Sequence, residues 1–354
     1  MDLELQECIK QLKTEIDRYY YSVFVTIGIK SFVEDKQNSN LDLKFVSAER
    51  KMKHNLTKLD VGNPDIILQY LSNPEGIIIE FKSSSPLNPS VFTKSIDDDI
   101  EQLQRYDKEL IGWDTESHLV KNHVIVFLVH YDDYKKIRTE IIENRIKNGK
   151  LSFNHIFSIW EWNPNISTKH GSGQHIVIRD YDGGIIGNQL GQYMKERDIL
   201  LIVSDIESLY GDKQLKFIRK KPPMAYLIDV VLFILVSEYA SGDEITVSLD
   251  DLMGAAEKYF PTWVPDCSQK SQIKKSWIMD CMNVLQDIKI VKRIDRDNYT
   301  IKIPPKKDLT EEIIKRLAIL ELKKRRGDFR KTKIEETDLN AKILDDFKLN
   351  YDKF

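Results

Sequence analysis

Two short apolar runs lie close together in the first third of the chain. They are Ile66-Ile67-Leu68 and Ile77-Ile78-Ile79, and both are rich in β-branched residues. The turn-forming segment Ser72-Asn73-Pro74-Glu75-Gly76 separates them. Two such runs around such a break predict a β-hairpin.

The rest of the chain alternates between helical spacing and short apolar runs. The spacing predicts helices over residues 3–33, 45–56, 95–110 and 134–146, and the runs predict strands over 123–129, 156–162 and 198–204. Helices that alternate with strands indicate an α/β fold in which helices cover a mixed sheet.

The pattern changes near Arg219-Lys220-Lys221-Pro222-Pro223. Helices are predicted beyond it over residues 224–239, 248–259 and 268–286, followed by strands over 288–294 and 299–303. We therefore expect one domain over residues 1–218, a second over 219–304 and a charged helical tail over 305–354.

Composition narrows the class of protein. The chain has 354 residues, 41% of them hydrophobic, which suffices for two domains with real cores. Its net charge of −3 means that any nucleic-acid site must come from local basic patches. Three separated cysteines fit a reducing compartment. With neither a signal-peptide pattern nor a membrane-spanning apolar stretch, we expect a cytoplasmic protein without a membrane partner.

Charged residues lie at the ends of the predicted hairpin. Asp65 precedes the first strand, whereas Glu80 and Lys82 end the second. Because strand side chains alternate, Glu80 and Lys82 share a face and Phe81 lies on the other. If Asp65 pairs near Glu80, the two carboxylates repel unless a cation such as Mg²⁺ binds between them. The alternative is a surface hairpin with a salt-bridged rim.

These residues resemble the motif of a nuclease superfamily. Pro64-Asp65 followed by Glu80-Phe81-Lys82 is similar to the PD-(D/E)XK signature of restriction-endonuclease-like nucleases. Gln102 and Tyr106 follow on a predicted helix and resemble the QxxxY motif of its RecB-like and Holliday-junction-resolvase-like branch. The resemblance implies a restriction-endonuclease-like mixed sheet flanked by helices. In the alternative interpretation Tyr106 is a core residue and Gln102 a surface residue.

The resemblance also implies a metal site. Asp65, Glu80 and the backbone carbonyl of Phe81 would bind Mg²⁺, with Mn²⁺ as a substitute. Glu49 on the predicted helix 45–56 would complete the set, unless it is a solvated residue paired with Lys53. Glu15 in the first helix is the alternative acid.

The implied chemistry is phosphodiester hydrolysis without a covalent enzyme intermediate. The metal would lower the pKa of a water and offset charge on the scissile phosphate. Lys82 would position the water or stabilise the phosphorane, while Gln102 and Tyr106 orient the strand.

Three helices followed by a hairpin, over residues 219–304, resemble a winged helix-turn-helix domain. In that fold the third helix enters the major groove and the hairpin forms the wing. Six basic side chains are candidates for phosphate contacts: Lys270, Lys274, Lys275, Lys292, Arg293 and Arg296. The alternative is a winged helix that contacts protein.

The sequence thus predicts a Mg²⁺-dependent DNA endonuclease acting in defence, restriction, recombination or repair, with RNA as an alternative substrate. A partner protein or a second copy of the chain is a candidate activator. Two other functions stay open. One is a non-catalytic DNA-binding or assembly subunit that keeps a nuclease fold, and the other is a winged-helix transcription regulator.

Overall fold

The computed structural model describes residues 3–48, 50–82, 89–114, 120–164, 175–181, 189–202, 221–239, 244–261, 271–302 and 309–325. Its helices are α1 (Leu3–Glu34), η1 (Lys36–Leu41), α2 (Pro89–Tyr106), α3 (Tyr131–Arg138), the π-helix η2 (Thr139–Ile146), α4 (Gln189–Glu196), α6 (Met224–Glu238), α7 (Leu249–Tyr259), α8 (Lys275–Asp287) and α9 (Leu309–Arg325). Within these ranges, no helix combines the length and apolar character needed to cross a membrane.

A seven-stranded mixed sheet forms the centre of the fold. Its strands, in sheet order, are β1 (Leu43–Ala48), β4 (Ile66–Tyr70), β5 (Glu75–Lys82), β7 (Asn122–His130), β8 (Ile156–Asn163), β9 (His175–Asp180) and β10 (Ile199–Ile202). Strands β5, β7 and β8 run parallel, and their outer neighbours pair antiparallel. The predicted α/β fold with a mixed sheet flanked by helices is therefore confirmed.

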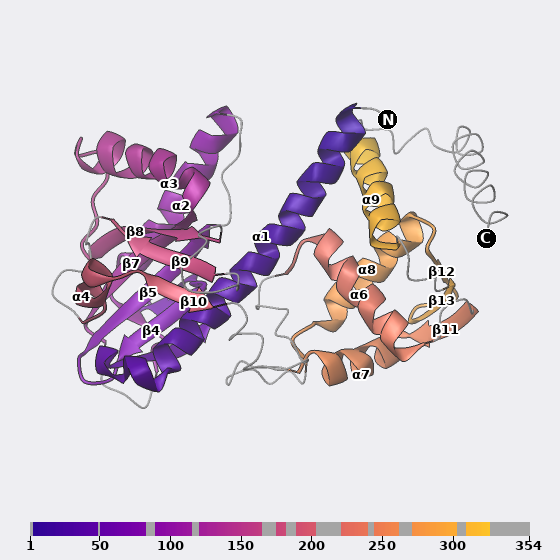
Figure 1. Cartoon of the computed structure of the whole chain (residues 1–354), viewed down its shortest axis with the longest axis horizontal. Coiled ribbons are helices and arrows are strands. Elements are labelled where there is room, and N and C mark those ends of the chain that lie inside the picture. The colour runs from indigo at the N-terminus through magenta and orange to yellow at the C-terminus, as the bar shows by residue number, and fades with distance from the viewer. Residues whose placement is uncertain are drawn as a thin grey trace. The chain divides into compact units, whose positions relative to one another are not determined.

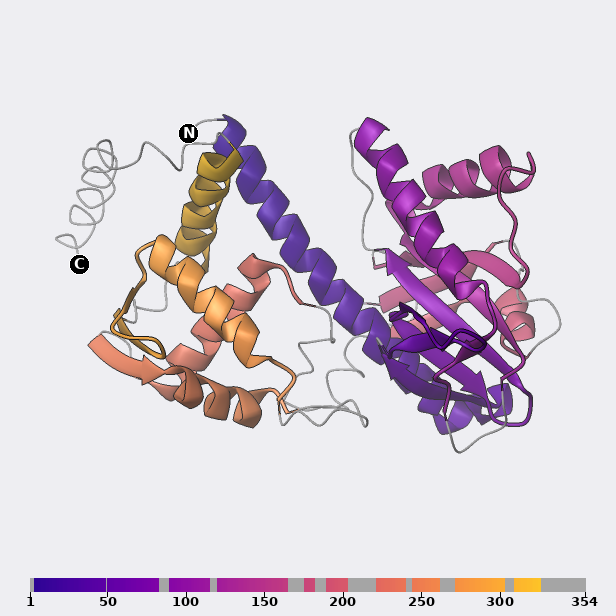
Figure 2. The same ribbon diagram turned by 180° about the vertical axis from the view of Figure 1, so that it is seen from behind.

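Helices cover both faces of this sheet (Figures 1 and 2). On one face, Leu103 of α2 and Ile137 of α3 share a buried core with Ile78 and Ile125 of the central strands. On the other face, Tyr21 of α1 packs against Trp162 of β8, with ring centroids 5.8 Å apart. Strands buried on both faces explain the continuous apolar runs in the sequence.

The predicted helix over residues 45–56 is wrong. Residues 43–48 form β1, in which Phe45 pairs with Leu68 of β4, and Met52–His54 form β2. Strand β2 pairs with β3 (Asp60–Gly62) and with β6 (Leu110–Ile111) in a small second sheet. Pairing with the buried strand β4 outweighs the weak helical spacing of this segment.

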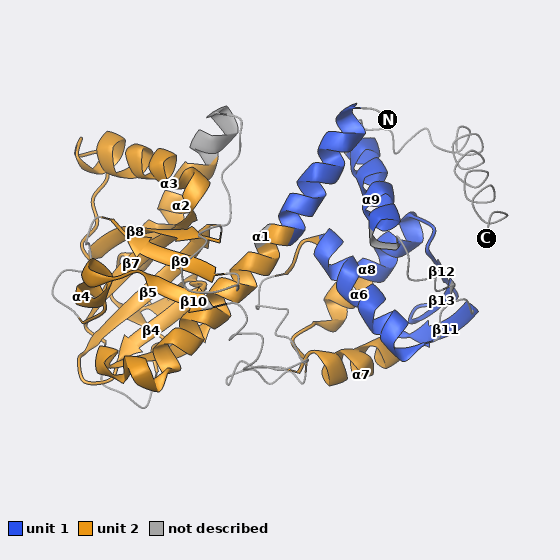
Figure 3. Cartoon of the chain, in the orientation of Figure 1, with its two compact units in different colours: residues 1–16, 224–248, 280–354 blue, residues 17–223, 249–279 orange. Residues whose placement is uncertain are grey.

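The chain divides into two compact units, coloured separately in Figure 3. Unit 2 comprises residues 17–223 and 249–279 and holds the seven-stranded sheet. Unit 1 comprises residues 1–16, 224–248 and 280–354. The predicted division at residues 218 and 304 stays a prediction.

Unit 1 joins the beginning of the chain to its C-terminal part. Cys8 of α1 donates from Sγ to the carbonyl oxygen of Ala318 in α9, at 3.6 Å, and both residues are buried with Leu322. A three-stranded antiparallel sheet in this unit has the order β11 (Glu244–Ser248), β13 (Asn298–Lys302) and β12 (Val291–Arg293). The predicted hairpin of β12 and β13 is confirmed, whereas β11 was not predicted.

Helix α8 starts later than the sequence pattern indicates. Residues 271–274 of the predicted helix 268–286 are not helical, and residues 268–270 lie outside the described residues. Ser271 instead forms an isolated antiparallel bridge with Pro261. Its hydroxyl donates to the carbonyl oxygen of Phe260 at 3.0 Å, so this segment returns along the end of α7 before the helix begins.

Candidate active site at the end of the β4–β5 hairpin

The hairpin register places the two carboxylates of the motif opposite each other. Ile66 of β4 pairs with Ile79 of β5, so Asp65 faces Glu80 one residue further along. Both side chains are buried, each with 8% relative exposure. The backbone N–H of Phe81 donates to Oδ2 of Asp65 at 2.7 Å, which fixes that carboxylate against β5.

Helix α2 contacts Glu80 through the second part of the motif. The Tyr106 hydroxyl donates to Oε2 of Glu80 at 3.2 Å, and the Gln102 amide Nε2 donates to the Tyr106 oxygen at 3.1 Å. Burial, together with the negative charge of Glu80, raises the pKa of Tyr106 far above its usual range. The phenol therefore stays protonated and continues to donate its hydrogen bond to Glu80.

Lys82 also faces α2, as strand alternation predicts. Its Nζ donates to Oγ of Ser95 at 2.9 Å and forms an ion pair with Asp99. Burial lowers the pKa of Lys82 to about 8, although Asp133 and Asp98 act in the opposite direction. Phe81 lies on the other face, where its ring packs 5.2 Å from that of Trp162.

Ser95 and Asp99 were missed by the sequence reasoning. Together with Gln102 and Tyr106 they occur at i, i+4, i+7 and i+11 of α2, which places them on one stripe of the helix. All four side chains contact the hairpin residues or one another in the pairs described above. The helical period of this polar stripe was the available signal.

A glycine backs the Tyr106 ring. Gly62 of β3 has φ +139°, and a Cβ atom at this position would lie 3.1 Å from the Tyr106 hydroxyl oxygen and 3.2 Å from its Cε1. Both the backbone conformation and the close approach favour glycine here. The β2–β3 hairpin therefore packs closely against the Tyr106 ring and hydroxyl.

The C-terminal end of α2 is fixed by a second polar cluster. The Asp107 carboxylate accepts hydrogen bonds from the backbone N–H groups of Asn154 and His155, at 2.7 and 2.8 Å. The His155 ring stacks on that of His123, with centroids 4.0 Å apart, and His123 Nε2 lies 2.8 Å from the Tyr106 carbonyl oxygen. These contacts set where α2 ends and thus where Tyr106 lies.

The donor chemistry of this site fits a divalent cation. Asp65, directly before β4, and Glu80 of β5 could supply two carboxylate oxygens, of the kind that Mg²⁺ prefers. Within the described residues, no group of three or more His, Cys, Asp or Glu side chains is arranged to hold a metal. Glu49 lies outside these residues, and the alternative acid Glu15 belongs to unit 1, whereas Asp65 belongs to unit 2.

The candidate nucleic-acid residues fall in both units. Lys274 and Lys275 belong to unit 2, where Lys275 forms an ion pair with Asp250 at 2.5 Å. The other three described candidates, Lys292, Arg293 and Arg296, are exposed and belong to unit 1. Lys270 lies outside the described part of the chain.

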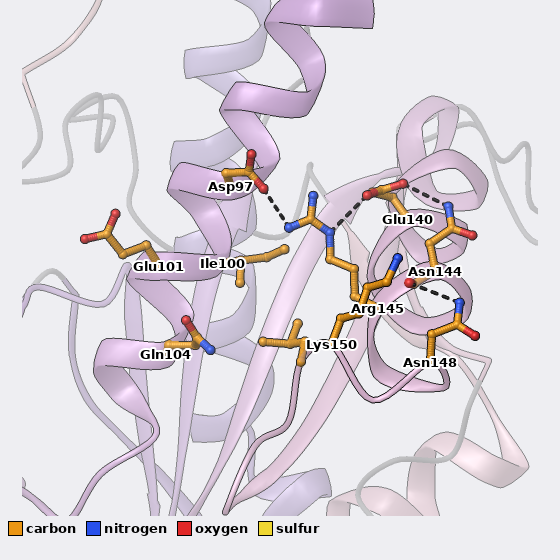
Figure 4. Close-up of a pocket in the computed structure, with 10 residues that line it drawn as sticks. Asp97, Ile100, Glu101, Gln104, Glu140, Asn144, Arg145, Asn148 and Lys150 are labelled. Atoms are coloured by element: carbon orange, nitrogen blue, oxygen red, sulfur yellow. Dashed lines mark hydrogen bonds and ion pairs between the residues drawn. The ribbon is translucent and has the colours of Figure 1, made fainter.

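A separate hollow of about 690 Å³ lies between α2 and the π-helix η2 (Figure 4). Arg145 spans it, 2.6 Å from Asp97 and 2.9 Å from Glu140. Three acidic and two basic side chains line the hollow, so its charge does not favour a phosphate. Its lining contains none of the site residues predicted from the sequence.

Comparisons with protein-family models, with curated proteins and with solved structures found no match to this chain.

Proposed function

We infer that the chain is a metal-dependent nuclease of the PD-(D/E)XK type that hydrolyses phosphodiester bonds in DNA. The observation that carries this proposal is the convergence of Asp65, Glu80 and Lys82 at one end of the β4–β5 hairpin. A salt-bridged surface rim is the weaker explanation, because all three side chains are buried and face structured partners.

Each residue has a role that its contacts support. Asp65 and Glu80 would hold Mg²⁺ or Mn²⁺, with the carbonyl of Phe81 and an acid such as Glu49 completing the ligands. When bound, the cation would lower the pKa of a water and offset charge on the scissile phosphate. Lys82, two residues after Glu80 on the same face of β5, has its Nζ held by Ser95 and Asp99 of α2. In this proposal Lys82 orients the attacking water or stabilises charge on phosphorus.

The contacts suggest a positioning role for the QxxxY pair. Gln102 donates to Tyr106, and Tyr106 donates to Glu80, so the three form a relay of hydrogen bonds that fixes one carboxylate. A fixed carboxylate is preorganised for a cation and loses little freedom when it binds. Gln102 keeps a second amide N–H for the nucleic-acid backbone.

The C-terminal segments support a DNA-binding module of the winged-helix class. Helix α6, strand β11, helices α7 and α8 and the β12–β13 hairpin follow one another in the order helix, strand, helix, helix, strand, strand. Exposed Lys292, Arg293 and Arg296 lie on the hairpin or its turn, where a wing would meet phosphates. In this proposal the module increases affinity without reading sequence.

Cleavage by the purified full chain tests the proposal. Plasmid DNA, linear DNA and RNA are incubated with Mg²⁺, with Mn²⁺ or with EDTA, using the wild type, Asp65→Ala, Lys82→Ala and the control Lys121→Ala. Lys121 is exposed and precedes β7, whose first residues pair with the beginning of β5 rather than with Glu80. Circular dichroism shows whether each variant is folded.

We expect cleavage only with a divalent cation. Its rate should fall on the order of 100-fold or more in Asp65→Ala and Lys82→Ala, and should be unchanged in Lys121→Ala. Nucleic-acid binding without cleavage under every condition, partner proteins included, would instead indicate a non-catalytic subunit or a transcription regulator.

A further inference from the structure

The β2–β3 hairpin leaves the sheet at the candidate active site. Ala48 of β1 pairs with Ile66 of β4, and the described residues 50–65 lie between these two paired positions in the chain, outside the seven-stranded sheet. This segment ends at Asp65, which faces Glu80. The hairpin also meets the site through Gly62, which packs against the Tyr106 hydroxyl that donates to Glu80.

The base of the hairpin is part of the core. Met52 and Val61 are buried in the same apolar cluster as Tyr106, and Lys53 of β2 pairs with Ile111 of β6. Gly62 packs against the Tyr106 ring, as described above. A hairpin with such a base keeps its position relative to the carboxylates.

The tip of the hairpin is ordered and displays two leucines. The backbone N–H of Lys58 donates to the His54 carbonyl oxygen at 2.9 Å, and that of Thr57 donates to His54 Nδ1 at 3.1 Å. Leu56 and Leu59 nevertheless have relative exposures of 79% and 68%. Two large apolar side chains are thus exposed within four residues of each other, which makes this tip a candidate contact surface.

The charge around these leucines favours a polyanion. Residues 50–60 contain four basic side chains (Arg50, Lys51, Lys53 and Lys58) and one acidic side chain, Asp60, although the whole chain has a net charge of −3. Lys51 forms an ion pair with Asp60 at 2.6 Å, whereas Lys53 and Lys58 are exposed. Apolar side chains flanked by lysines match a groove of duplex DNA, where leucine inserts between bases and lysine binds phosphates.

We propose that the β2–β3 hairpin is a second contact for duplex DNA, in which Leu56 and Leu59 meet the bases and Lys53 and Lys58 bind phosphates. The inference rests on the proposed function, because it is the carboxylate site that brings DNA past the hairpin. Leu59 lies three positions before Gly62, so at most about 10 Å of extended chain separates this leucine from the glycine that packs against Tyr106.

Binding of a fluorescent duplex tests this contact. The full chain carries Lys82→Ala to suppress cleavage, and a set of duplexes carries 2-aminopurine at one position each, scanned along the duplex. Leu56→Ser/Leu59→Ser is compared with Leu71→Ser as the matched control. Leu71 is 50% exposed and follows β4 at the end away from Asp65.

We expect the double variant to bind the duplex at least about tenfold more weakly and to lose the fluorescence increase of an unstacked 2-aminopurine. Leu71→Ser should bind like its parent, and thermal unfolding should be unchanged in both because the leucines are exposed. Unchanged affinity and fluorescence in the double variant would overturn the proposal. A change in oligomeric state by light scattering, with DNA binding intact, would also overturn it and assign the leucines to a second copy.

Cleavage by the wild type separates this proposal from the proposed function. If the wild type cleaves DNA and the double variant binds like its parent, only the hairpin contact is wrong. If the wild type binds DNA without cleaving it and the double variant loses binding, the hairpin contact stands and the nuclease proposal fails.

Discussion

Acid should destabilise this protein through His123, at the start of β7. The side chain is buried, with 4% relative exposure, and its Nε2 lies 2.8 Å from the Tyr106 carbonyl oxygen. Burial, and after it the neighbouring ring of His155, lower the pKa of His123 from 6.5 to about 4, although the Tyr106 carbonyl and Asp107 act in the opposite direction. His123 is therefore neutral in the folded protein at pH 7.

The sign and size of the effect follow from proton binding in the two states. In the unfolded chain His123 binds a proton below about pH 6.5, whereas in the folded protein it does so only below about pH 4. The stabilisation by neutral His123 is thus complete above pH 6.5, decreases as the pH falls and is lost below pH 4. The difference between the two pKa values corresponds to about 3 kcal/mol in full, and to about 2 kcal/mol by pH 5.

Urea unfolding of the wild type and His123→Gln, at pH 7 and at pH 5, measures this contribution. We expect the free energy of unfolding of the wild type to fall by about 2 kcal/mol more than that of His123→Gln between the two pH values. His54→Gln, at the partly exposed tip of the β2–β3 hairpin, is the control and should keep the wild-type pH dependence. An equal decrease in the wild type and His123→Gln would refute the assignment to His123.

Two glycine substitutions test close contacts, one beside Tyr106 at the site and one at the opposite end of β5. Gly62→Ala places a methyl group against the Tyr106 hydroxyl on a backbone with φ +139°. We expect the free energy of unfolding to fall by about 1–3 kcal/mol and metal-dependent cleavage to be slower. A variant that melts and cleaves like the wild type would contradict the proposed contact between Gly62 and Tyr106. Gly76→Ala in β5 would put Cβ 2.3 Å from Cζ3 of Trp113, and we expect a loss of about 1–3 kcal/mol in urea unfolding. In a Trp113→Leu background, Gly76→Ala should cost less free energy of unfolding. An equal cost in both backgrounds would show that the Trp113 ring is not the cause.

The sequence predicts the parts of the site that depend on local periodicity. Alternation along the β5 strand was enough to place Glu80 and Lys82 on one face and Phe81 on the other. The apolar runs of β4, β5 and β7 were recognisable because these strands are buried on both faces. The α/β fold followed from their alternation with helices.

The predictions from sequence fail where contacts between segments distant in the chain decide the structure. Residues 45–56 have apolar spacing that a helix could bury, but Phe45 pairs with Leu68 of β4, which a single sequence does not reveal. Asp99 was missed for a related reason. Its stripe on α2 is visible in the sequence, but its importance depends on which face of the helix meets Lys82.

The contacting residues of the candidate site also lie close together along the chain. Sixteen residues separate Asp65 from Phe81, 13 separate Lys82 from Ser95, and 26 separate Glu80 from Tyr106. Closing loops this short costs little chain entropy, and the cost grows only slowly with length. Contacts of this range form readily during folding, because low contact order favours rapid folding. The carboxylate pair and its helix would thus be an early folding nucleus, around which the longer-range parallel pairing of β5 with β7 and of β7 with β8 is completed.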